Sequence, residues 1–182
     1  MGLILEKGRP EDTSGRLDKE IRCYDLLDRL GVEYWRVDHP AAFTMEACLE
    51  IDGALGTAMC KNLLLTNRQH TARYLLLMPG DKVFKTKELS SQINSARLSF
   101  ASGEEMEKYL DITPGSLSIL GLMNDRGKEV RLLVDRDILS QEYQGVHPCV
   151  NTSSIKLKTA DLFGAFLKDT GHEMQIVELI GE

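Results

Sequence analysis

The sequence predicts a mixed α/β (α+β) fold, a single compact domain with a barrel-like, largely antiparallel mixed sheet flanked by helices. Strand-like and helix-like segments are interspersed without the strict alternation that builds a doubly wound sheet. Short polar links between apolar runs indicate two or more hairpins. No G-x-G-x-x-G pattern follows a predicted strand, which disfavours a Rossmann-type sheet. The 182 residues are enough for one sizeable hydrophobic core.

The protein is expected to divide into a short arm and one domain. Residues 1–16 are predicted to form a flexible N-terminal arm, because Gly8, Pro10 and Gly15 interrupt any regular pattern. Residues 17–182 are predicted to form the domain. No internal repeat or linker divides this second segment.

Five helices are expected from apolar residues at helical spacing and from capping residues. Gly31 ends the first helix, and Thr44 is the N-cap of the second. Ser102 and Glu105 form a capping box at the start of the fourth, and Thr159 caps the last. The predicted helices span residues 18–30, 44–51, 86–94, 102–110 and 159–170.

Eight strands are expected from short apolar runs. The most apolar, 61–66 and 73–78, are joined by a short polar link and should form a hairpin. A second hairpin is predicted at the turn 124–127, between strands 117–122 and 129–134. The other predicted strands span residues 32–37, 96–100, 153–157 and 174–179.

The composition indicates a globular, cytoplasmic protein. Hydrophobic residues make up 42% and charged residues 27%, unlike a disordered protein. No apolar run approaches the roughly 20 residues of a membrane helix, and the first residues are too short for a signal peptide. The cysteines form no C-x-x-C pair, so neither zinc nor a disulfide framework is expected. We expect buried or half-buried thiols at Cys23, Cys48 and Cys60. Cys149 lies within a motif described below and can be a buried thiol or, in an electropositive site, a catalytic thiolate.

The charge is unevenly distributed along the sequence. The net charge is −6, which argues against a general nucleic-acid coat. Residues 61–101 nevertheless contain seven Lys or Arg against two Asp or Glu, a charge of +5, so the remaining residues carry −11. Such a basic face can steer a polyanion to one place, or it can be a solvated face without a partner. The charge pattern alone leaves both interpretations open.

Chemistry is expected at three places in the sequence. Lys61 and Asn62 stand at the entry of a very apolar strand, either aimed at a phosphate or carbonyl or simply solvated at a strand end. The run 113–118 contains a Pro-Gly turn that can point N–H groups at an anion, although such turns are usually only turns. The predicted loop 145–148 and the residues up to Thr152 bring together a histidine, an asparagine and a threonine.

The four histidines are expected to differ in role. His147 titrates near neutral pH and can orient or transfer a proton, or it can make a structural hydrogen bond. His39, also before a proline, can play either part. His70 and His172 lie in polar surroundings and are expected on the surface. The sequence contains no G-x-S-x-G, P-loop, H-E-x-x-H or C-x-x-C motif.

Together these motifs, in this order and spacing, resemble the signature of YbaK-like aminoacyl-tRNA editing domains. The nearest likeness is the free-standing prolyl-tRNA editing branch known as PrdX or ProXp-ala. The resemblance covers roughly residues 17–179. It is carried by Lys61-Asn62-Leu63-Leu64-Leu65, by Pro114-Gly115-Ser116-Leu117-Ser118 with Gly121-Leu122 and Asn124-Asp125, by Gly145-Val146-His147-Pro148 with Asn151-Thr152, and by His39-Pro40 with Phe43-Thr44 and Glu46-Ala47.

The resemblance implies a compact domain without a metal or organic cofactor. It also implies that Lys61 and Asn62 hold the terminal adenosine and its phosphate, that Gly115 sits against the aminoacyl ester, and that His147 lines the same pocket. Cys149 and Ser153 depart from residues common in the family, which bears on amino-acid specificity. The expected catalytic residues are Lys61, Gly115 and His147, and the expected substrate-binding residues are Asn62, Ser116, Ser118, Pro148, Asn151 and Thr152.

The implied function is trans-editing, the hydrolysis of the ester in mischarged tRNA(Pro), with Ala-tRNA(Pro) as substrate. The main-chain N–H groups near Gly115 and Ser116 are expected to stabilise the oxyanion. The expected partners are the acceptor end of tRNA(Pro) and prolyl-tRNA synthetase, with no membrane. The alternatives are a deacylase for Cys- or Ser-tRNA(Pro) and a non-catalytic module that binds aminoacyl-tRNA.

Overall fold

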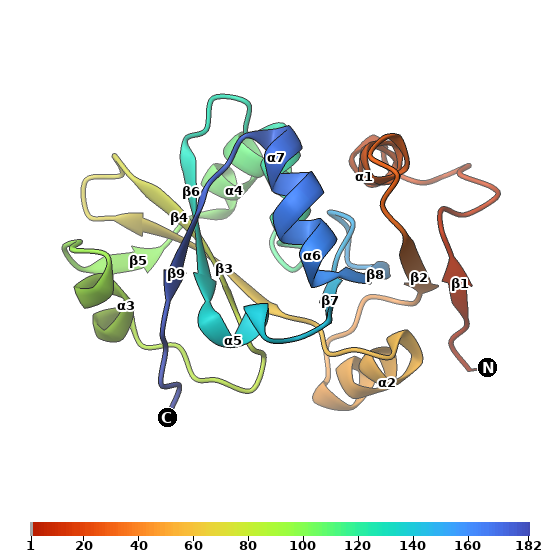
Figure 1. Ribbon diagram of the computed structural model, residues 1–182, viewed down its shortest axis with the longest axis horizontal. Coiled ribbons are helices and arrows are strands. Elements are labelled where there is room, and N and C mark those ends of the chain that lie inside the picture. The colour runs from red at the N-terminus through yellow and green to blue at the C-terminus, as the bar shows by residue number, and fades with distance from the viewer. Residues whose placement is uncertain (1) are drawn as a thin grey trace.

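Two sheets form the frame of the protein in the computed structural model, which describes residues 2–182 (Figure 1). The larger sheet has the strand order β5-β3-β4-β6-β9, and the smaller has the order β1-β2-β8-β7. The larger consists of β5 (Leu98–Phe100), β3 (Lys61–Asn67), β4 (Arg73–Met78), β6 (Val130–Asp135) and β9 (Met174–Val177). The smaller consists of β1 (Leu5–Lys7), β2 (Tyr34–Asp38), β8 (Ser153–Lys158) and β7 (Tyr143–Val146).

Most strand pairs are antiparallel. All pairs of the smaller sheet run antiparallel, as do β5-β3 and β3-β4 in the larger one. Only β4-β6 and β6-β9 are parallel. The predicted mixed α/β fold with a largely antiparallel sheet is therefore confirmed, but the strands form two open sheets and no closed barrel within residues 2–182.

The helices lie around and between the two sheets (Figure 1). Their bounds are α1 (Asp18–Arg29), α2 (Met45–Leu55), α3 (Thr86–Gln92), α4 (Gly103–Leu110), the 3-10 helix η1 (Ile119–Asn124), α5 (Arg136–Leu139), α6 (Thr159–Asp161), the π-helical turn η2 (Leu162–Phe166) and α7 (Leu167–Thr170). The last three form the continuous helical run predicted at 159–170. No helix in the described part of the protein is both long and apolar enough to cross a bilayer.

The predicted caps at Thr44 and Ser102 are confirmed by hydrogen bonds, but the one at Thr159 is wrong, because the helix begins at Thr159 itself and its hydroxyl donates to the Gln141 carbonyl. The Thr44 hydroxyl accepts from the Ala47 N–H at 3.1 Å, and the Ser102 hydroxyl accepts from the Glu105 N–H at 3.1 Å. Helix α2 runs past its predicted end to Gly56, whose φ of 80° gives a left-handed C-cap.

The β3-β4 hairpin is predicted correctly and is buried on both faces. Leu64, Leu75 and Leu77 pack into the core shared with the smaller sheet, while Leu65 and Leu76 pack on the other face against α3 and β9. Side chains alternate between the faces of a strand. Burial on both faces explains why these strands are continuous apolar runs rather than alternating ones.

The predicted strand at 117–122 is wrong. Residues 119–124 form the 3-10 helix η1, and the Ser118 hydroxyl caps it by accepting from the Leu120 N–H at 3.1 Å. A short apolar run without polar alternation does not distinguish a strand from a buried helix. The predicted hairpin at 124–127 is wrong as well, because this turn leads from η1 into β6, which pairs in parallel with β4.

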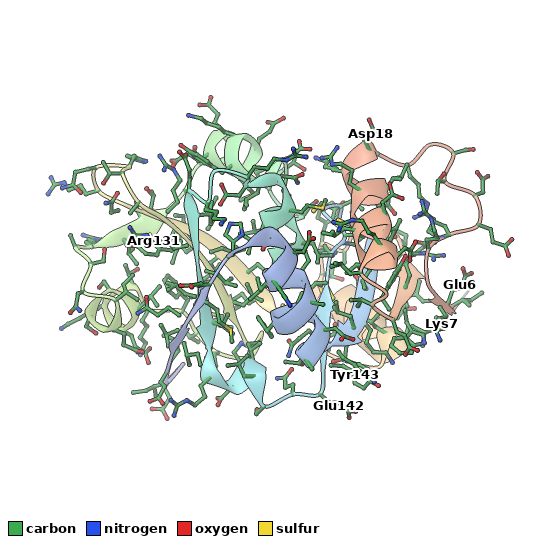
Figure 2. The ribbon with its side chains drawn as sticks, turned by 45° about the horizontal axis from the view of Figure 1, so that its top comes forward. Glu6, Lys7, Asp18, Arg131, Glu142 and Tyr143 are labelled. Atoms are coloured by element: carbon green, nitrogen blue, oxygen red, sulfur yellow. The ribbon has the colours of Figure 1, made fainter. Side chains whose placement is uncertain are left out.

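Two strands were not predicted. The expected loop at 145–148 overlaps strand β7, which ends at Val146 and pairs with β8. The expected arm, residues 1–16, contributes β1 at the edge of the smaller sheet. Figure 2 shows Glu6 and Lys7 projecting from this strand at one end of the molecule.

Two residues, His172 and Cys48, differ in burial from the prediction. His172, expected on the surface, is only 7% exposed, and its Nε2 lies 2.9 Å from the Asp125 carboxylate. The Asp125 turn and the end of α7 meet there, which the local sequence does not reveal. Cys48, expected to be at least half-buried, is exposed on α2, while the other three thiols are buried or half-buried. His70 is exposed, as predicted.

Candidate functional site

Two adjoining cavities open where the sheets meet. The main cavity, about 590 Å³, takes its walls from α2, the start of β3, the 79–81 turn, α5 and the ends of β2, β7 and β8. The edge cavity, about 390 Å³, lies beside β3, β5 and α4. The residues that line both cavities are Met59, Cys60, Gly115 and His147. Two of the three predicted catalytic residues therefore stand at the junction.

His147 presents one free ring nitrogen at this junction. Its Nδ1 lies 2.9 Å from the Ser153 carbonyl oxygen. A carbonyl oxygen can only accept, so Nδ1 carries a proton and the Nε2 of the neutral ring is an acceptor. Burial lowers the pKa of His147, and the neighbouring His39 lowers it further, against the hydrogen bond to Ser153. The ring is thus neutral near pH 7, and its Nε2 has no partner within the described residues.

His39 lies beside His147 but is already satisfied. The two ring centroids are 6.4 Å apart. The His39 Nδ1 contacts the Pro40 carbonyl at 2.9 Å, and its Nε2 contacts the Ser154 hydroxyl at 2.8 Å. Both nitrogens of this buried ring are used, so His39 ties the segment that follows β2 to β8. His147 is the histidine that retains a group for chemistry.

Gly115 lies against Asn151 in the wall of the main cavity. Its φ of +93° is a conformation that residues with a Cβ rarely adopt. An added Cβ would lie 3.6 Å from the Asn151 Nδ2 atom. No acceptor for the Gly115 N–H is found within residues 2–182. The Ser116 N–H, in contrast, donates to the Thr113 carbonyl at 3.2 Å, so of the two expected oxyanion donors only Gly115 is free.

Lys61 is not among the residues that line either cavity. Its ammonium donates to the Lys82 carbonyl at 2.7 Å. The Lys82 ammonium in turn contacts carboxylate oxygens of Asp135 and Asp137, each at 2.8 Å. We call these four residues the lysine network. It holds the end of the 79–81 turn, whose residues line the main cavity.

Asn62 lines the edge cavity and keeps one unused group. Its Nδ2 donates to the Cys60 carbonyl at 3.2 Å. The Oδ1 atom is buried and has no hydrogen-bond partner within the described residues. A buried polar atom without a partner is costly, so such an atom in a cavity wall indicates a ligand contact. Lys61 and Asn62 are adjacent in the sequence but face opposite sides of β3.

The remaining predicted substrate-binding residues divide into two groups. Asn151 lines the main cavity and also a third cavity of about 500 Å³, where Ser116 and Thr152 lie. Ser118 is fully buried as the cap of η1, and Pro148 is buried without lining any of these cavities. The structure thus brings Asn62, Gly115, His147 and Asn151 together, whereas Ser118 supports the fold.

The cavity walls also contain residues that the sequence did not single out. Helix α2 contributes Met45, Leu49 and Asp52, and α5 contributes Ile138. Burial raises the pKa of Asp52, which accepts from the Met59 N–H at 3.2 Å. The only available signal was the position of Met45 and Leu49 on the helix predicted a few residues after His39.

The thiol at the junction of the cavities is not reactive, and residues 2–182 contain no metal cluster. Burial raises the pKa of the Cys60 thiol to about 11, so it is protonated near neutral pH and a poor nucleophile. No group of three or more His, Cys, Asp or Glu residues there has a spacing suited to a metal ion. The groups that remain for chemistry are a neutral imidazole, a free main-chain N–H and two amides.

Known proteins resemble this one along most of its length. Residues 39–165 match the aminoacyl-tRNA editing domain family. The prolyl-tRNA editing protein ProX of Acetoanaerobium sticklandii is 31% identical, and the match spans 84% of this protein and 93% of that one. The prolyl-tRNA synthetase associated domain-containing protein 1 of Xenopus laevis is 30% identical, with 90% and 98% spanned. A crystal structure described as a candidate trans-editing enzyme for prolyl tRNA synthetase has the same fold, with a TM-score of 0.67 and 16% identity over 90% of this protein and 98% of that one.

Proposed function

The chain belongs to the aminoacyl-tRNA editing domain family, and from this membership we propose that it is a trans-editing deacylase for mischarged tRNA(Pro), with Ala-tRNA(Pro) as substrate. The names of the relatives support the choice of tRNA(Pro). The observation that carries the proposal is the neutral His147 beside the free N–H of Gly115, at the junction of two cavities.

The proposed reaction is attack of water on the ester that joins the amino acid to the 3′ ribose. The Nε2 of His147 accepts a proton from the water, either directly or through the free ribose hydroxyl, and returns it to the ribose oxygen of the ester as the acyl C–O bond breaks. The Gly115 N–H donates to the oxyanion that develops on the carbonyl oxygen. Removing such a donor typically costs about 3 kcal/mol of transition-state stabilisation. Neither step requires a protein nucleophile.

Selectivity for alanine is proposed to be steric and to reside in the main cavity. Met45, Leu49 and Ile138 give it an apolar wall. One methylene in such a wall changes the discrimination by only about 1–3 kcal/mol. Strong protection of correctly charged Pro-tRNA(Pro) therefore requires that the proline ring clash with this wall rather than merely fit less well.

Lys61 is proposed to anchor the RNA end. An ammonium has three N–H donors, and the Lys82 carbonyl takes one of them. The other two can bind a phosphate as a point charge. The basic segment 61–101 supports the proposal that the acceptor stem lies along this side of the molecule. We further propose that prolyl-tRNA synthetase passes the mischarged tRNA(Pro) that it has made to this protein.

The Lys61→Ala substitution should nearly abolish deacylation, by roughly 100-fold or more in kcat/KM, because positioning contributes as much as acid–base chemistry. The melting temperature should change little, since Lys61 is half-buried at a strand end. Single-turnover deacylation and circular-dichroism melting check both statements. Wild-type turnover of Ala-tRNA(Pro) by this variant would show that Lys61 does not anchor the RNA end.

The function itself is tested by incubating the protein with labelled Ala-, Cys-, Ser- and Pro-tRNA(Pro) and following release of the amino acid. Release of alanine alone is the expected result. Release of cysteine or serine instead would identify a deacylase for that mischarged tRNA. Binding without release from any of the four would contradict the proposal and identify a non-catalytic aminoacyl-tRNA-binding module.

A further inference from the structure

One face of helix α2 forms part of the wall of the main cavity. Met45, Leu49 and Asp52 stand at positions i, i+4 and i+7 of this helix, so their side chains lie along one side of it. All three line the main cavity. Met45 and Leu49 belong to the apolar wall proposed to select alanine. Asp52 adds a half-buried carboxylate at the end of the same row.

The Asp52 carboxylate is held close to the junction of the two cavities. Its Oδ1 accepts from the Met59 N–H at 3.2 Å, and Met59 lines both cavities. The Met59 backbone bridges Gly145, and the adjacent Cys60 N–H donates to the Gly145 carbonyl at 3.1 Å. Gly145 lies two residues before His147. The carboxylate is therefore fixed by the segment of backbone that borders the strand leading to His147.

The main cavity presents negative charge without a balancing cation. Its walls contain the carboxylates of Asp52 and Asp81, and no Lys or Arg of the described residues lines it. Asp81 is exposed on the 79–81 turn, whereas Asp52 is half-buried. The Met59 N–H is the one hydrogen-bond donor to the Asp52 carboxylate among residues 2–182, so its Oδ2 is free. Burial raises the pKa of Asp52, and a cation beside it would favour the charged form.

We propose that the Asp52 carboxylate binds the α-ammonium of the aminoacyl group and thereby restricts the site to esters of amino acids with a free α-amino group. An α-amino group in a peptide titrates at about pH 7.7, so much of it is a cation near neutral pH. An ammonium that leaves water needs a hydrogen-bonded counter-charge. This inference rests on the proposed function for the identity of the ligand as an aminoacyl ester, and it adds the residue that recognises the amino group.

The substituents of the substrate's Cα match three parts of the cavity. The ester carbonyl lies at the junction, where the Gly115 N–H and the His147 Nε2 are free. The methyl group of alanine meets the apolar row of Met45 and Leu49. The ammonium, on the same carbon, then meets Asp52, at the end of that row and beside the junction. An acylated amino group, as in peptidyl-tRNA, carries no charge and leaves this carboxylate unpaired.

The binding test uses two stable amide analogues of the aminoacylated RNA end, 3′-alanylamino-3′-deoxyadenosine and its lactyl counterpart, in which a hydroxyl replaces the ammonium. Calorimetric titration of the protein near pH 7 should show about 10-fold or more tighter binding of the alanyl analogue, as for a hydrogen bond between charged groups. Asp52→Asn keeps an oxygen for the Met59 N–H but removes the charge. This variant should bind the alanyl analogue about 10-fold more weakly and the lactyl analogue as the wild type does.

Glu50→Gln is the matched control, because Glu50 is an exposed carboxylate of the same helix that lines neither the main nor the edge cavity. Both affinities should be unchanged in this variant. Equal binding of the two analogues by the wild type would overturn the inference. A preference for the alanyl analogue that is lost in Asp81→Asn but kept in Asp52→Asn would overturn it as well.

The second test compares single-turnover hydrolysis of Ala-tRNA(Pro) and lactyl-tRNA(Pro), with each rate divided by that of the spontaneous hydrolysis of the same ester. The wild type should favour the alanyl ester by about 10- to 100-fold, and Asp52→Asn should remove most of this preference. An equal loss for both esters would mean that Asp52 only supports the fold, and would overturn the inference while leaving the proposed deacylase intact. If neither ester is hydrolysed but the alanyl analogue still binds more tightly through Asp52, the ammonium site stands and the proposed reaction fails.

Discussion

The wall of the main cavity and the lysine network behind its 79–81 turn use their polar groups in different ways. In the wall, Gly115 and His147 each keep one hydrogen-bonding group free of partners within the described residues. Behind the turn, the charged groups bind their neighbours: Lys61 donates to the Lys82 carbonyl, and Lys82 pairs with Asp135. Free groups in a cavity wall carry chemistry, whereas satisfied groups fix geometry. The comparison therefore separates residues expected to react from residues expected to position.

The same contrast appears between the two histidines in the wall of the main cavity. His39 and His147 are neighbours of the same type, yet only His147 has an unused nitrogen. His147 is oriented by the Ser153 carbonyl, and the Ser153 hydroxyl donates to the Asp38 carboxylate. The Ser153 hydroxyl thus ties the strand that orients His147 to the end of β2. Substituting a residue that only supports His147 should therefore change the stability of the fold more than it changes the rate of the reaction.

The largest expected effect is that of His147→Ala. Loss of the proton acceptor should lower kcat/KM by roughly 100- to 1,000-fold, in the range of general acid–base catalysis, with little change in melting temperature. Single-turnover deacylation of Ala-tRNA(Pro) measures it. His70→Ala, on the exposed side of the turn after β3, is the control and should behave as the wild type. A drop of less than 10-fold would place the proton transfer on the ribose hydroxyl instead.

The second effect tests the lysine network. Lys82→Met should lower kcat/KM only about 10-fold, through the 79–81 turn, but should destabilise the fold by about 1.5–3 kcal/mol. The cost is larger than for a surface ion pair because Asp135 is only 1% exposed and loses its charged partner. Urea unfolding measures it, with Lys85→Met as a nearby control. A fully active, equally stable variant would show that the network has no positioning role.

The sequence predicted the groups of the site better than their directions. His147 and Gly115 were singled out because a histidine before a proline and a Pro-Gly turn are local patterns. Lys61 and Asn62 were treated as one pair, yet successive side chains of a strand point to opposite faces, and only strand packing shows which face meets the cavity. Asp52 and Ile138 reach the cavity through tertiary contacts alone, so no local pattern indicated them.

The fold shows the same division between local and distant signals. The hairpin β3-β4 and the caps at Thr44 and Ser102 were predicted because their signals lie within a few residues. Strand β7 was missed because Gly145 suggested a loop. Gly145 is instead required by close packing, since an added Cβ would lie 2.9 Å from the Ala58 carbonyl oxygen.

The third effect is the pH dependence of kcat/KM, which we expect His147 to set. Burial lowers the pKa of His147 below its usual value, and the neutral ring is the active form. The kcat/KM should therefore begin to fall only at a lower pH than for an ordinary histidine, which is half protonated near pH 6.5, and should fall up to about 10-fold per pH unit below the lowered pKa. In His147→Ala this acid limb should be absent. A midpoint above about pH 7 in the wild type would contradict a buried neutral base.

The smallest effect concerns Asp38, whose carboxylate accepts a hydrogen bond from Ser153, the residue that orients His147. Burial alone would raise its pKa, but hydrogen bonds from Arg16, Ser153 and Arg36 lower it to about 2. Because the folded-state pKa lies below the unfolded value of about 3.9, the stabilisation is complete above that value and is lost as the pH falls from about 4 to 2.

The Asp38 carboxylate is partly exposed, so solvent screening reduces this contribution to about 1 kcal/mol. Asp38→Asn should therefore be about 1 kcal/mol less stable than the wild type at pH 7 and equally stable near pH 2, as followed by urea unfolding. Asp25→Asn, which removes an exposed pair with Arg9, should show almost no difference at either pH. A pH-independent loss for Asp38→Asn would mean that the residue acts by packing rather than by charge. The orientation of His147 through Ser153 would then not depend on the ionised carboxylate.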